Sequence, residues 1–125
     1  MKKGLILSLL LVVTVATASH ALYNIGWGYV YNSTGNPVEG AHVAGWAILA
    51  PAVCGTFDSY SNGYYELNSS VVPHAGWYTF CASKSGEGIK RENIYKASAE
   101  NPITWYPWLT GTYETCQCEE PFSDR

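Results

Sequence analysis

The stretch from Gly28 to Ala82 constrains the fold of this chain more than any other feature. Short runs of alternating polar and apolar residues recur in it, separated by turns rich in Gly, Pro and Asn, such as Asn36-Pro37 and Asn62-Gly63. Alternation bounded by such residues is typical of short strands that bury one face. The stretch therefore predicts an all-β fold, a single antiparallel β-sandwich of seven or eight strands with Greek-key-type connections.

The alternation places the expected strands at residues 24–31, 41–49, 54–57, 64–67, 76–83 and 89–95. In the first of these we expect one face to carry Ile25, Trp27, Tyr29 and Tyr31. Pro51 should end the second strand, and the polar run 89–95 should be an edge strand. Residues 96–102 read as a loop. Residues 104–109 and 113–118 form either two last strands or one strand and a tail.

The N-terminus has the layout of a secretory signal peptide. Lys2 and Lys3 precede an apolar run at residues 5–16, and small residues follow. This order predicts a helical leader, residues 1–21, with cleavage after Ala18 or Ala21. A retained membrane anchor is the alternative, but a spanning helix needs roughly 20 apolar residues. We expect residues 22–118 to form one exported domain, secreted or held at the cell surface, and residues 119–125 to form a disordered tail.

Charge excludes some classes of partner. Loss of Lys2 and Lys3 with the leader leaves five basic against ten acidic residues, a formal charge of −5. Few cations on an acidic domain argue against binding nucleic acid or anionic lipid headgroups. The mature chain has no second apolar run, so we expect no membrane insertion after cleavage.

The four cysteines are Cys54, Cys81, Cys116 and Cys118. An even number in a small exported domain predicts disulfides, and three pairings are possible. A Cys54–Cys81 bridge would force Cys116 to pair with Cys118 across one residue. Alternatively, Cys116 and Cys118, which share a face in an extended chain, bridge Cys54 and Cys81 separately. We favour this cross-pairing over a redox-active Cys116-Gln117-Cys118, which lacks a cationic neighbour.

Several of these residues match a known pattern. They are Gly28 and Val30; Gly35, Pro37, Val38, Gly40, Ala41 and Val43; Asn62-Gly63-Tyr64-Tyr65; and Gly76, Tyr78, Phe80 and Ala82. Over about half of its length the chain resembles the carboxypeptidase regulatory-like domain, a prealbumin-like (transthyretin-like) sandwich. Gly35 and Gly63 suit turn positions with positive φ. The inner face should include Val30, Val43, Tyr65 and Phe80.

The resemblance implies a non-catalytic module. Domains of this kind are usually accessory to peptidases, transporters and surface proteins, and starch-binding modules and pilin-like adhesins share the fold. The match fades beyond Ser83, so the Trp-rich, Cys-bearing C-terminus lies outside the family pattern. Fold alone does not fix function.

Two N-glycosylation motifs occur, at Asn32 and Asn68, both in expected turns. Asp58-x-Tyr60-x-Asn62-Gly63 lacks the ligands of a calcium loop and reads as a turn. His42 and His74 lack metal-ligand spacing, so we expect no metal and no cofactor. We expect no enzyme either, because no nucleophile elbow is present and nothing supports pairing Glu66 with Glu114.

The chain has five Trp and ten Tyr against three Phe. The densest cluster contains Trp105, Tyr106 and Trp108, our candidate ligand-binding residues. One reading is that this cluster fills the core or covers a sheet edge. The other two are that it contacts a protein or stacks on sugars, which Trp and Tyr suit because they combine a flat apolar ring with a polar edge.

Two functions follow as hypotheses. The first is a secreted, non-catalytic module of surface structure or protein–protein interaction, assembling with itself or with another extracellular protein. The second is a monomeric carbohydrate-binding module that requires Trp105 and Trp108 to be exposed together. Whether the segment from Lys96 completes the sandwich or swaps into a neighbour is left open by the sequence.

Overall fold

The computed structural model describes residues 22–119; the predicted leader, residues 1–21, and residues 120–125 of the predicted tail lie outside the described residues. Every regular element in the described part is a strand, which confirms the all-β prediction. The strands are β1 (Tyr23–Tyr29), β2 (His42–Ala47), β3 (Ala50–Asp58), β4 (Tyr64–Ser69), β5 (Gly76–Lys84), β6 (Gly88–Lys96) and β7 (Ile103–Thr104).

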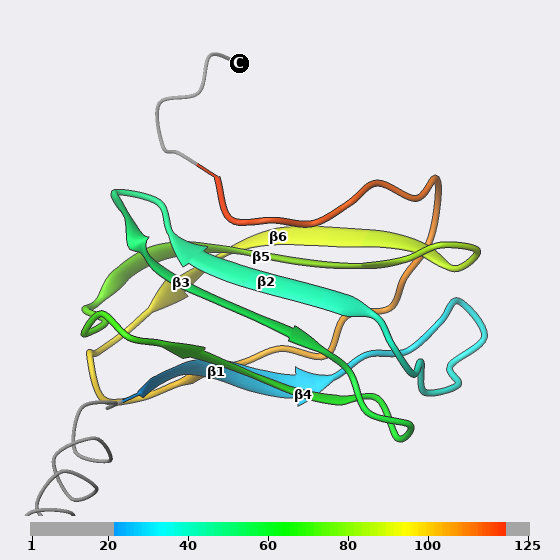
Figure 1. The fold of residues 1–125 in the computed structure, drawn as a ribbon, viewed down its shortest axis with the longest axis horizontal. Helices are drawn as coiled ribbons and strands as arrows, with labels where there is room; N and C mark the ends of the chain where they lie inside the picture. Colours follow the sequence, from blue (N-terminus) through cyan, green and yellow to red (C-terminus); the bar gives the residue numbers. More distant parts are fainter. Residues whose placement is uncertain (1–21, 120–125) are drawn as a thin grey trace, which may run out of the picture.

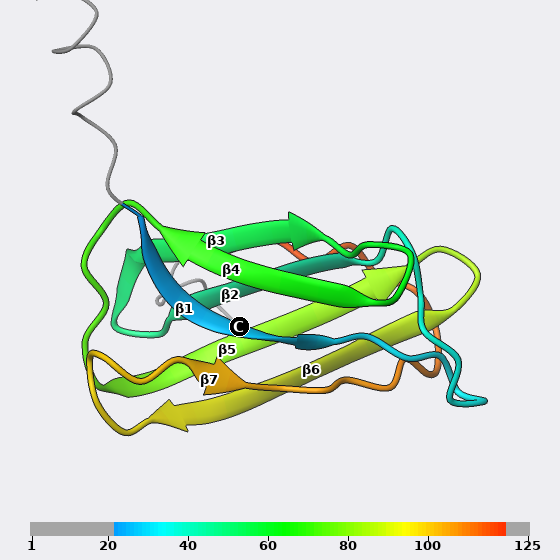
Figure 2. The ribbon, with the colours of Figure 1, turned by 90° about the horizontal axis from the view of Figure 1, so that it is seen from below.

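The strands form two layers (Figures 1 and 2). One sheet has the order β4-β1-β7 and the other the order β3-β2-β5-β6. The chain crosses between the layers four times, and the β2–β3 and β5–β6 hairpins stay within the larger sheet. The polar strand β6 lies at the edge of that sheet, as its sequence predicted.

The core lies between the layers. Val30, Val43, Tyr65 and Phe80 are fully buried in it, as expected for the inner face. The ring of Phe80 packs edge-to-face on Trp105 with centroids 5.6 Å apart. Gly35 and Gly63 have φ of 88° and 87°, so both occupy turn positions that favour glycine.

Strand β1 departs from the expected pattern. A bulge between Asn24 and Gly26 inserts one residue against β4. Ile25 still points into the core, but Trp27 and Tyr29 point outward, so the prediction that Ile25 shares a face with them is wrong. An extra residue in a period-two strand reverses the side on which later side chains emerge.

The second and third predicted strands, residues 41–49 and 54–57, also have different bounds in the structure. Strand β2 ends at Ala47, residues 48 and 49 turn, and β3 has begun by Ala50. Pro51 therefore lies within β3 rather than ending β2, and β3 is longer than the predicted run 54–57. Strand β3 is the edge of its sheet, where a residue without an N–H is tolerated.

The C-terminal segment completes the sandwich within the same chain. Strand β7 pairs with β1 in parallel, through Gly26 with Ile103 and Trp27 with Thr104. Both strands start at the same end of the sandwich (Figure 2), so their directions agree, and the prediction of wholly antiparallel pairing is wrong. Beyond β7, single bridges join Trp108 to Tyr31 and Thr110 to Ile89.

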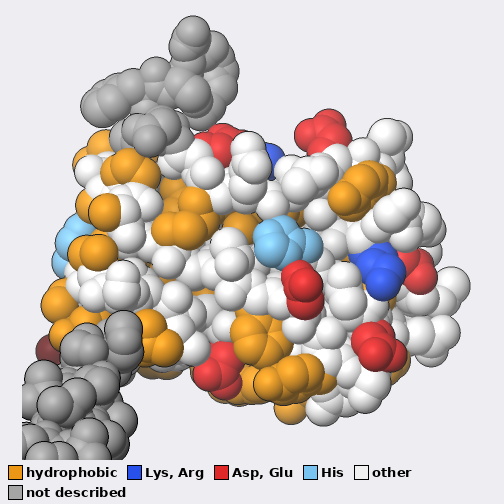
Figure 3. All heavy atoms as spheres, viewed as in Figure 1, with side chains coloured by type: hydrophobic (Ala, Val, Ile, Leu, Met, Phe, Trp, Pro, Cys, Tyr) orange, Lys and Arg blue, Asp and Glu red, His pale blue; other side chains and the backbone are white. Residues whose placement is uncertain are grey.

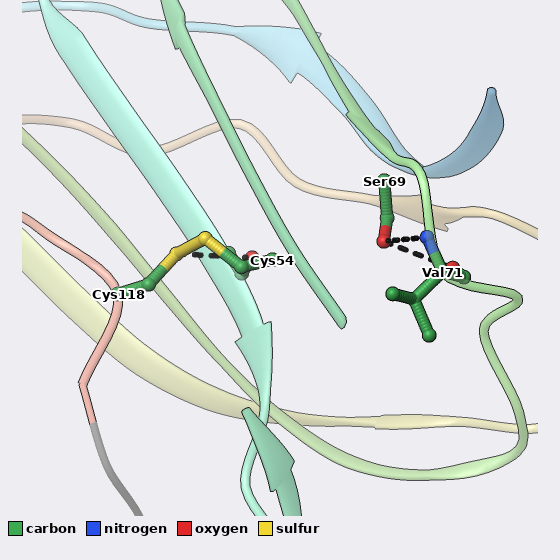
Figure 4. Close-up of a disulfide and its surroundings, with 5 residues drawn as sticks. Cys54, Ser69, Val71 and Cys118 are labelled. Atoms are coloured by element: carbon green, nitrogen blue, oxygen red, sulfur yellow. Dashed lines mark hydrogen bonds between the residues drawn. A yellow bond between two sulfur atoms is a disulfide. The ribbon is translucent and has the colours of Figure 1, made fainter. Parts of the chain in front are cut away.

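Residues 110–118, which we name the strap, then cross the outer face of the larger sheet without forming a strand (Figure 1). Disulfides join Cys81 of β5 to Cys116 and Cys54 of β3 to Cys118. Cys118 lies beside the carbonyl oxygen of Gly45, at 3.8 Å, so the strap passes over β2 (Figure 4). The structure thus selects one form of the cross-pairing.

Arg91 holds the end of the strap. Its Nη1 lies 3.4 Å from a carboxylate oxygen of Glu119. This ion pair joins Glu119, the first residue of the predicted tail, to β6. Under the strap lies a second small apolar cluster, built from Ala44, Trp46, Cys81 and Cys116.

Candidate binding face

The outer face of the three-stranded sheet carries a row of aromatic rings. Alternation on β1 points Trp27 and Tyr29 outward, and alternation on β4 does the same for Tyr64. Tyr106 follows β7 and Tyr60 lies in the turn before β4. We name these five residues the aromatic face.

The rings touch one another in sequence. Centroid distances are 6.2 Å from Tyr60 to Tyr64, 5.4 Å from Tyr64 to Tyr29, 6.1 Å from Tyr29 to Tyr106 and 6.2 Å from Tyr106 to Trp27. Such contacts favour edge-to-face and offset geometries. Tyr60 and Tyr64 are nearly parallel, with 22° between their planes. The row therefore runs continuously from the β3–β4 turn across β4 and β1 to the segment after β7.

Polar groups border the rings on the same sheet face. The carboxylate of Glu66 accepts hydrogen bonds from the Tyr64 hydroxyl and from Asn68 Nδ2, each at 3.1 Å. Asn24 Nδ2 donates to Asn68 Oδ1 at 3.1 Å. Partial burial and then the hydrogen bond to Glu66 raise the pKa of Tyr64 above its usual value. The face thus offers a carboxylate and amides in fixed positions beside the rings.

The three candidate ligand-binding residues Trp105, Tyr106 and Trp108 do not lie on one face of the chain. From Ile103 to Leu109, buried and exposed side chains alternate strictly, so Trp105 points inward while Tyr106 and Trp108 point outward. Trp105 is only 7% exposed, and its Nε1 donates to Glu92 at 2.9 Å. The expectation that Trp105 and Trp108 are exposed together is wrong. In an extended chain, residues an odd number of positions apart lie on opposite faces, and these two are three positions apart.

Tyr106 and Trp108 keep their exposure, at 49% and 50%. Tyr106 belongs to the aromatic face. Trp108 lies farther along, where it packs on Tyr31 with centroids 5.7 Å apart and against Gly35 of the following turn. Sequence reasoning missed Trp27, Tyr29, Tyr60 and Tyr64. The signal that could have found the first two is the recurrence of Trp and Tyr at positions 27, 29 and 31.

The two glycosylation motifs differ in structure. Asn32 is in a turn, where its Oδ1 accepts bonds from the Thr34 hydroxyl at 2.8 Å and from the backbone N–H groups of Thr34 and Asn36. Asn68 lies in strand β4, so the prediction that it is in a turn is wrong. Beyond it, the Ser69 hydroxyl ends the strand by bonding both the N–H and the carbonyl of Val71 (Figure 4).

Other chemistry-bearing groups of residues 22–119 lie in the disulfides and in a row of Asp58, His42 and Ser83 across the larger sheet. Within residues 22–119 no group of three or more His, Cys, Asp or Glu could hold a metal, and all four cysteines are in disulfides. The expected turn from Asp58 to Gly63 begins later than predicted, because Asp58 is the last residue of β3 and the turn hydrogen bond joins Gly63 to Tyr60. His42 Nδ1 lies 2.7 Å from Asp58. Ser83 lies next to His42 across the sheet, but its hydroxyl is buried without a hydrogen-bond partner. Ser83 therefore makes no hydrogen bond to His42 of the kind that activates a serine nucleophile.

No helix in residues 22–119 has both the length and the hydropathy needed to cross a membrane. Comparison with protein-family models, with curated proteins and with solved structures finds no match for this chain.

Proposed function

We propose that this protein is an exported, non-catalytic binding module of the carboxypeptidase regulatory-like type, with Greek-key connections, and that the aromatic face is its ligand-binding surface. The observation that carries the proposal is the continuous row of five rings on one exposed sheet face. The two disulfides are consistent with an extracellular location. Of the five rings, Tyr60 and Tyr106 are exposed and the other three are half-buried, so the row presents a connected aromatic surface to solvent.

Carbohydrate is the ligand class that this face suits best. The outward side chains of β1 and β4 here are aromatic, amide or carboxylate, namely Asn24, Trp27, Tyr29, Tyr64, Glu66 and Asn68. No Leu, Ile, Val or Met is among them. Aromatic rings pack against the apolar faces of sugar rings, while a carboxylate and amides bond their hydroxyls. The row extends across three chain segments, which suits an extended glycan of several residues.

Binding to a panel of soluble and insoluble polysaccharides tests the proposal. Tyr60→Ala and Tyr106→Ala remove the two most exposed rings of the face, and each should weaken binding at least about tenfold, as for aromatic anchors elsewhere. Tyr113→Ala is the matched control, since Tyr113 is an exposed tyrosine of the strap outside the face. Absence of binding across a broad panel, or equal losses for all three variants, would contradict a glycan function.

A protein partner is the second candidate, since Tyr and Trp are also enriched at protein interfaces. That partner is a second copy of the chain or another surface protein. Light scattering after size exclusion separates the candidates. Oligomers or filaments that Tyr60→Ala and Tyr106→Ala dissociate would favour assembly through the face, and a monomer that binds polysaccharide would favour the glycan function.

A further inference from the structure

One charged side chain lies among the rings of the aromatic face. In the described strands β1, β4 and β7 there is no Lys, Arg, Asp or His, and Glu66 is the single acid. Glu66 points outward from β4 between Tyr64 and Asn68, and the residue opposite it on β1 is Trp27. Side chains paired in this way have β-carbons about 5 Å apart, so Trp27 borders the carboxylate.

The carboxylate of Glu66 is held in place by its neighbours. The Tyr64 hydroxyl donates to one of its oxygens and Asn68 Nδ2 to the other, each at 3.1 Å, and Asn24 in turn holds Asn68. A carboxylate has about four acceptor positions, so these two bonds leave capacity for donors of a ligand. Because Glu66 is half-buried, salt screens its charge less than that of an exposed carboxylate. The face thus presents one positioned negative charge.

Positive charge lies on the other sheet. The Lys and Arg side chains of residues 22–119 are all in β5 and β6, and they are Lys84, Lys90, Arg91 and Lys96. Lys84 donates to the carbonyl oxygen of Glu39, Arg91 pairs with Glu119, and Lys96 donates to carbonyl oxygens of the loop that follows it.

The surface has the same division of charge. Along the lower border in Figure 3, where Figure 1 places β1 and β4, the coloured side chains are hydrophobic or acidic and none is blue. The three-stranded sheet therefore offers an anionic ligand no cation in its described strands. A cationic ligand meets a carboxylate beside aromatic rings.

We propose that the aromatic face selects glycans that carry free amino groups, an inference that rests on the proposed glycan function and narrows its substrate class. The ammonium group of an amino sugar donates to the remaining acceptor positions of Glu66, while the sugar ring packs on Trp27 and the neighbouring tyrosines. An ammonium group near the face of Trp27 also gains a cation–π attraction. A neutral glycan has only the packing and the hydroxyl bonds, and a polyuronate places its own carboxylates against Glu66.

Other cations fit this face less well. A metal ion needs several ligands, and within residues 22–119 no group of three or more His, Cys, Asp or Glu could hold one. A basic protein segment shares the ammonium chemistry, but its lysine side chains are aliphatic chains. A row of rings that crosses three chain segments matches a polymer with a ring in every unit.

Affinity for soluble oligosaccharides of one length tests the selection. The probes are glucosamine oligomers, their N-acetylated counterparts, a neutral glucan oligomer and an oligouronate. Calorimetric titration uses the exported protein with both disulfides intact, in mildly acidic buffer where the sugar amines are protonated. The wild type should bind glucosamine oligomers at least about tenfold more tightly than the N-acetylated ones, as expected for hydrogen bonds between charged groups. Added salt should reduce this preference, and the oligouronate should bind most weakly.

Glu66→Gln removes the charge and nearly keeps the size of the side chain. It should weaken the binding of glucosamine oligomers at least about tenfold and change the binding of N-acetylated oligomers less than about twofold. Glu114→Gln is the matched control, because it changes the net charge equally at an exposed position of the strap. This control should bind every probe like the wild type. Circular dichroism should show the same fold for both variants.

The results distinguish failure of the selection from failure of the glycan function. Equal affinity of the wild type for glucosamine and N-acetylated oligomers, or equal losses in Glu66→Gln and Glu114→Gln, would overturn the selection alone if Tyr60→Ala and Tyr106→Ala still weaken binding. No binding of any oligosaccharide would overturn both. Oligolysine that binds as tightly as the glucosamine oligomers, with the same loss in Glu66→Gln, would assign the face to a basic protein segment.

Discussion

The hydroxyl of Tyr65 in β4 donates a hydrogen bond to the carbonyl oxygen of Trp105 at 2.8 Å, although Trp105 directly follows β7 at the opposite edge of the three-stranded sheet. Strand β1 lies between them, and the residue of β1 opposite Tyr65 is Gly28. A β-carbon at Gly28 would lie 1.8 Å from that same carbonyl oxygen. Absence of a side chain at one position thus allows a buried tyrosine to hold the C-terminal segment against the core.

Gly28→Ala should therefore destabilise the protein severely, by about 3 kcal/mol or more, because the clash is with backbone and cannot be relieved by a rotamer change. Urea denaturation of wild type and variant, disulfides intact, measures this loss. Gly86→Ala is the control: its β-carbon would meet nothing within 4 Å, so its cost, about 1–2 kcal/mol, comes only from its positive φ. A Gly28→Ala variant no less stable than Gly86→Ala would refute the close approach.

Tyr65 should also make stability fall at alkaline pH. Burial raises its pKa well above the ordinary value, so the folded protein keeps the phenol proton while the unfolded chain loses it above about pH 10. The stabilising contribution is present below that pH and is lost as pH rises further, by up to about 1.4 kcal/mol per pH unit.

Comparison with Tyr65→Phe isolates this effect. The variant should be about 1–3 kcal/mol less stable near neutrality, because the Trp105 carbonyl loses its buried donor, yet its stability should fall less steeply at alkaline pH. Burial also raises the pKa of Tyr78, and the lowered pKa of Lys96 acts in the opposite direction, so the difference between the two proteins is the informative quantity. Parallel pH profiles would show that Tyr65 does not titrate differently on unfolding.

The disulfide pairing can be checked without cleaving between Cys116 and Cys118. Replacing Cys54 and Cys118 together by Ser, or Cys81 and Cys116 together, should leave no free thiol by titration under denaturing conditions. Either loss should cost about 4 kcal/mol on the chain-entropy account. The crossed variant Cys54→Ser with Cys116→Ser leaves Cys81 and Cys118, which are not partners, and should show two free thiols. Thiols in the first two variants and none in the third would reverse the assignment.

Glycosylation should distinguish the two motifs in a competent host. Asn32 lies in a turn with its Oδ1 bonded to the Thr34 hydroxyl, whereas Asn68 is in a strand with its Nδ2 bonded to Glu66. Mass spectrometry of the exported protein should find a glycan on Asn32, lost in Thr34→Ala, and little or none on Asn68. A glycan mainly on Asn68 would contradict this and would cover the aromatic face.

Local sequence determined which residues share a side over short distances. Strand β5 lies where its sequence predicted it, β6 is the polar edge strand, and the buried residues Val30, Val43, Tyr65 and Phe80 are all in the core. Turn glycines at Gly35 and Gly63 also follow from sequence, because positive φ is costly for other residues. Each of these features depends on neighbours within a few positions.

Tertiary structure decided which side faces inward where both sides are apolar. In β1 the bulge places Gly26 and Gly28 over Phe80 and Trp105, and so directs Trp27 and Tyr29 to the surface. The same kind of choice buried Trp105 and exposed Trp108. Alternation shows which residues of a strand share a face, but not which of the two faces points into the core. A one-residue insertion exchanges the two faces for the residues that follow it. The parallel β7 and the partners of Cys116 and Cys118 likewise depend on contacts between distant segments, which only the folded sandwich brings together.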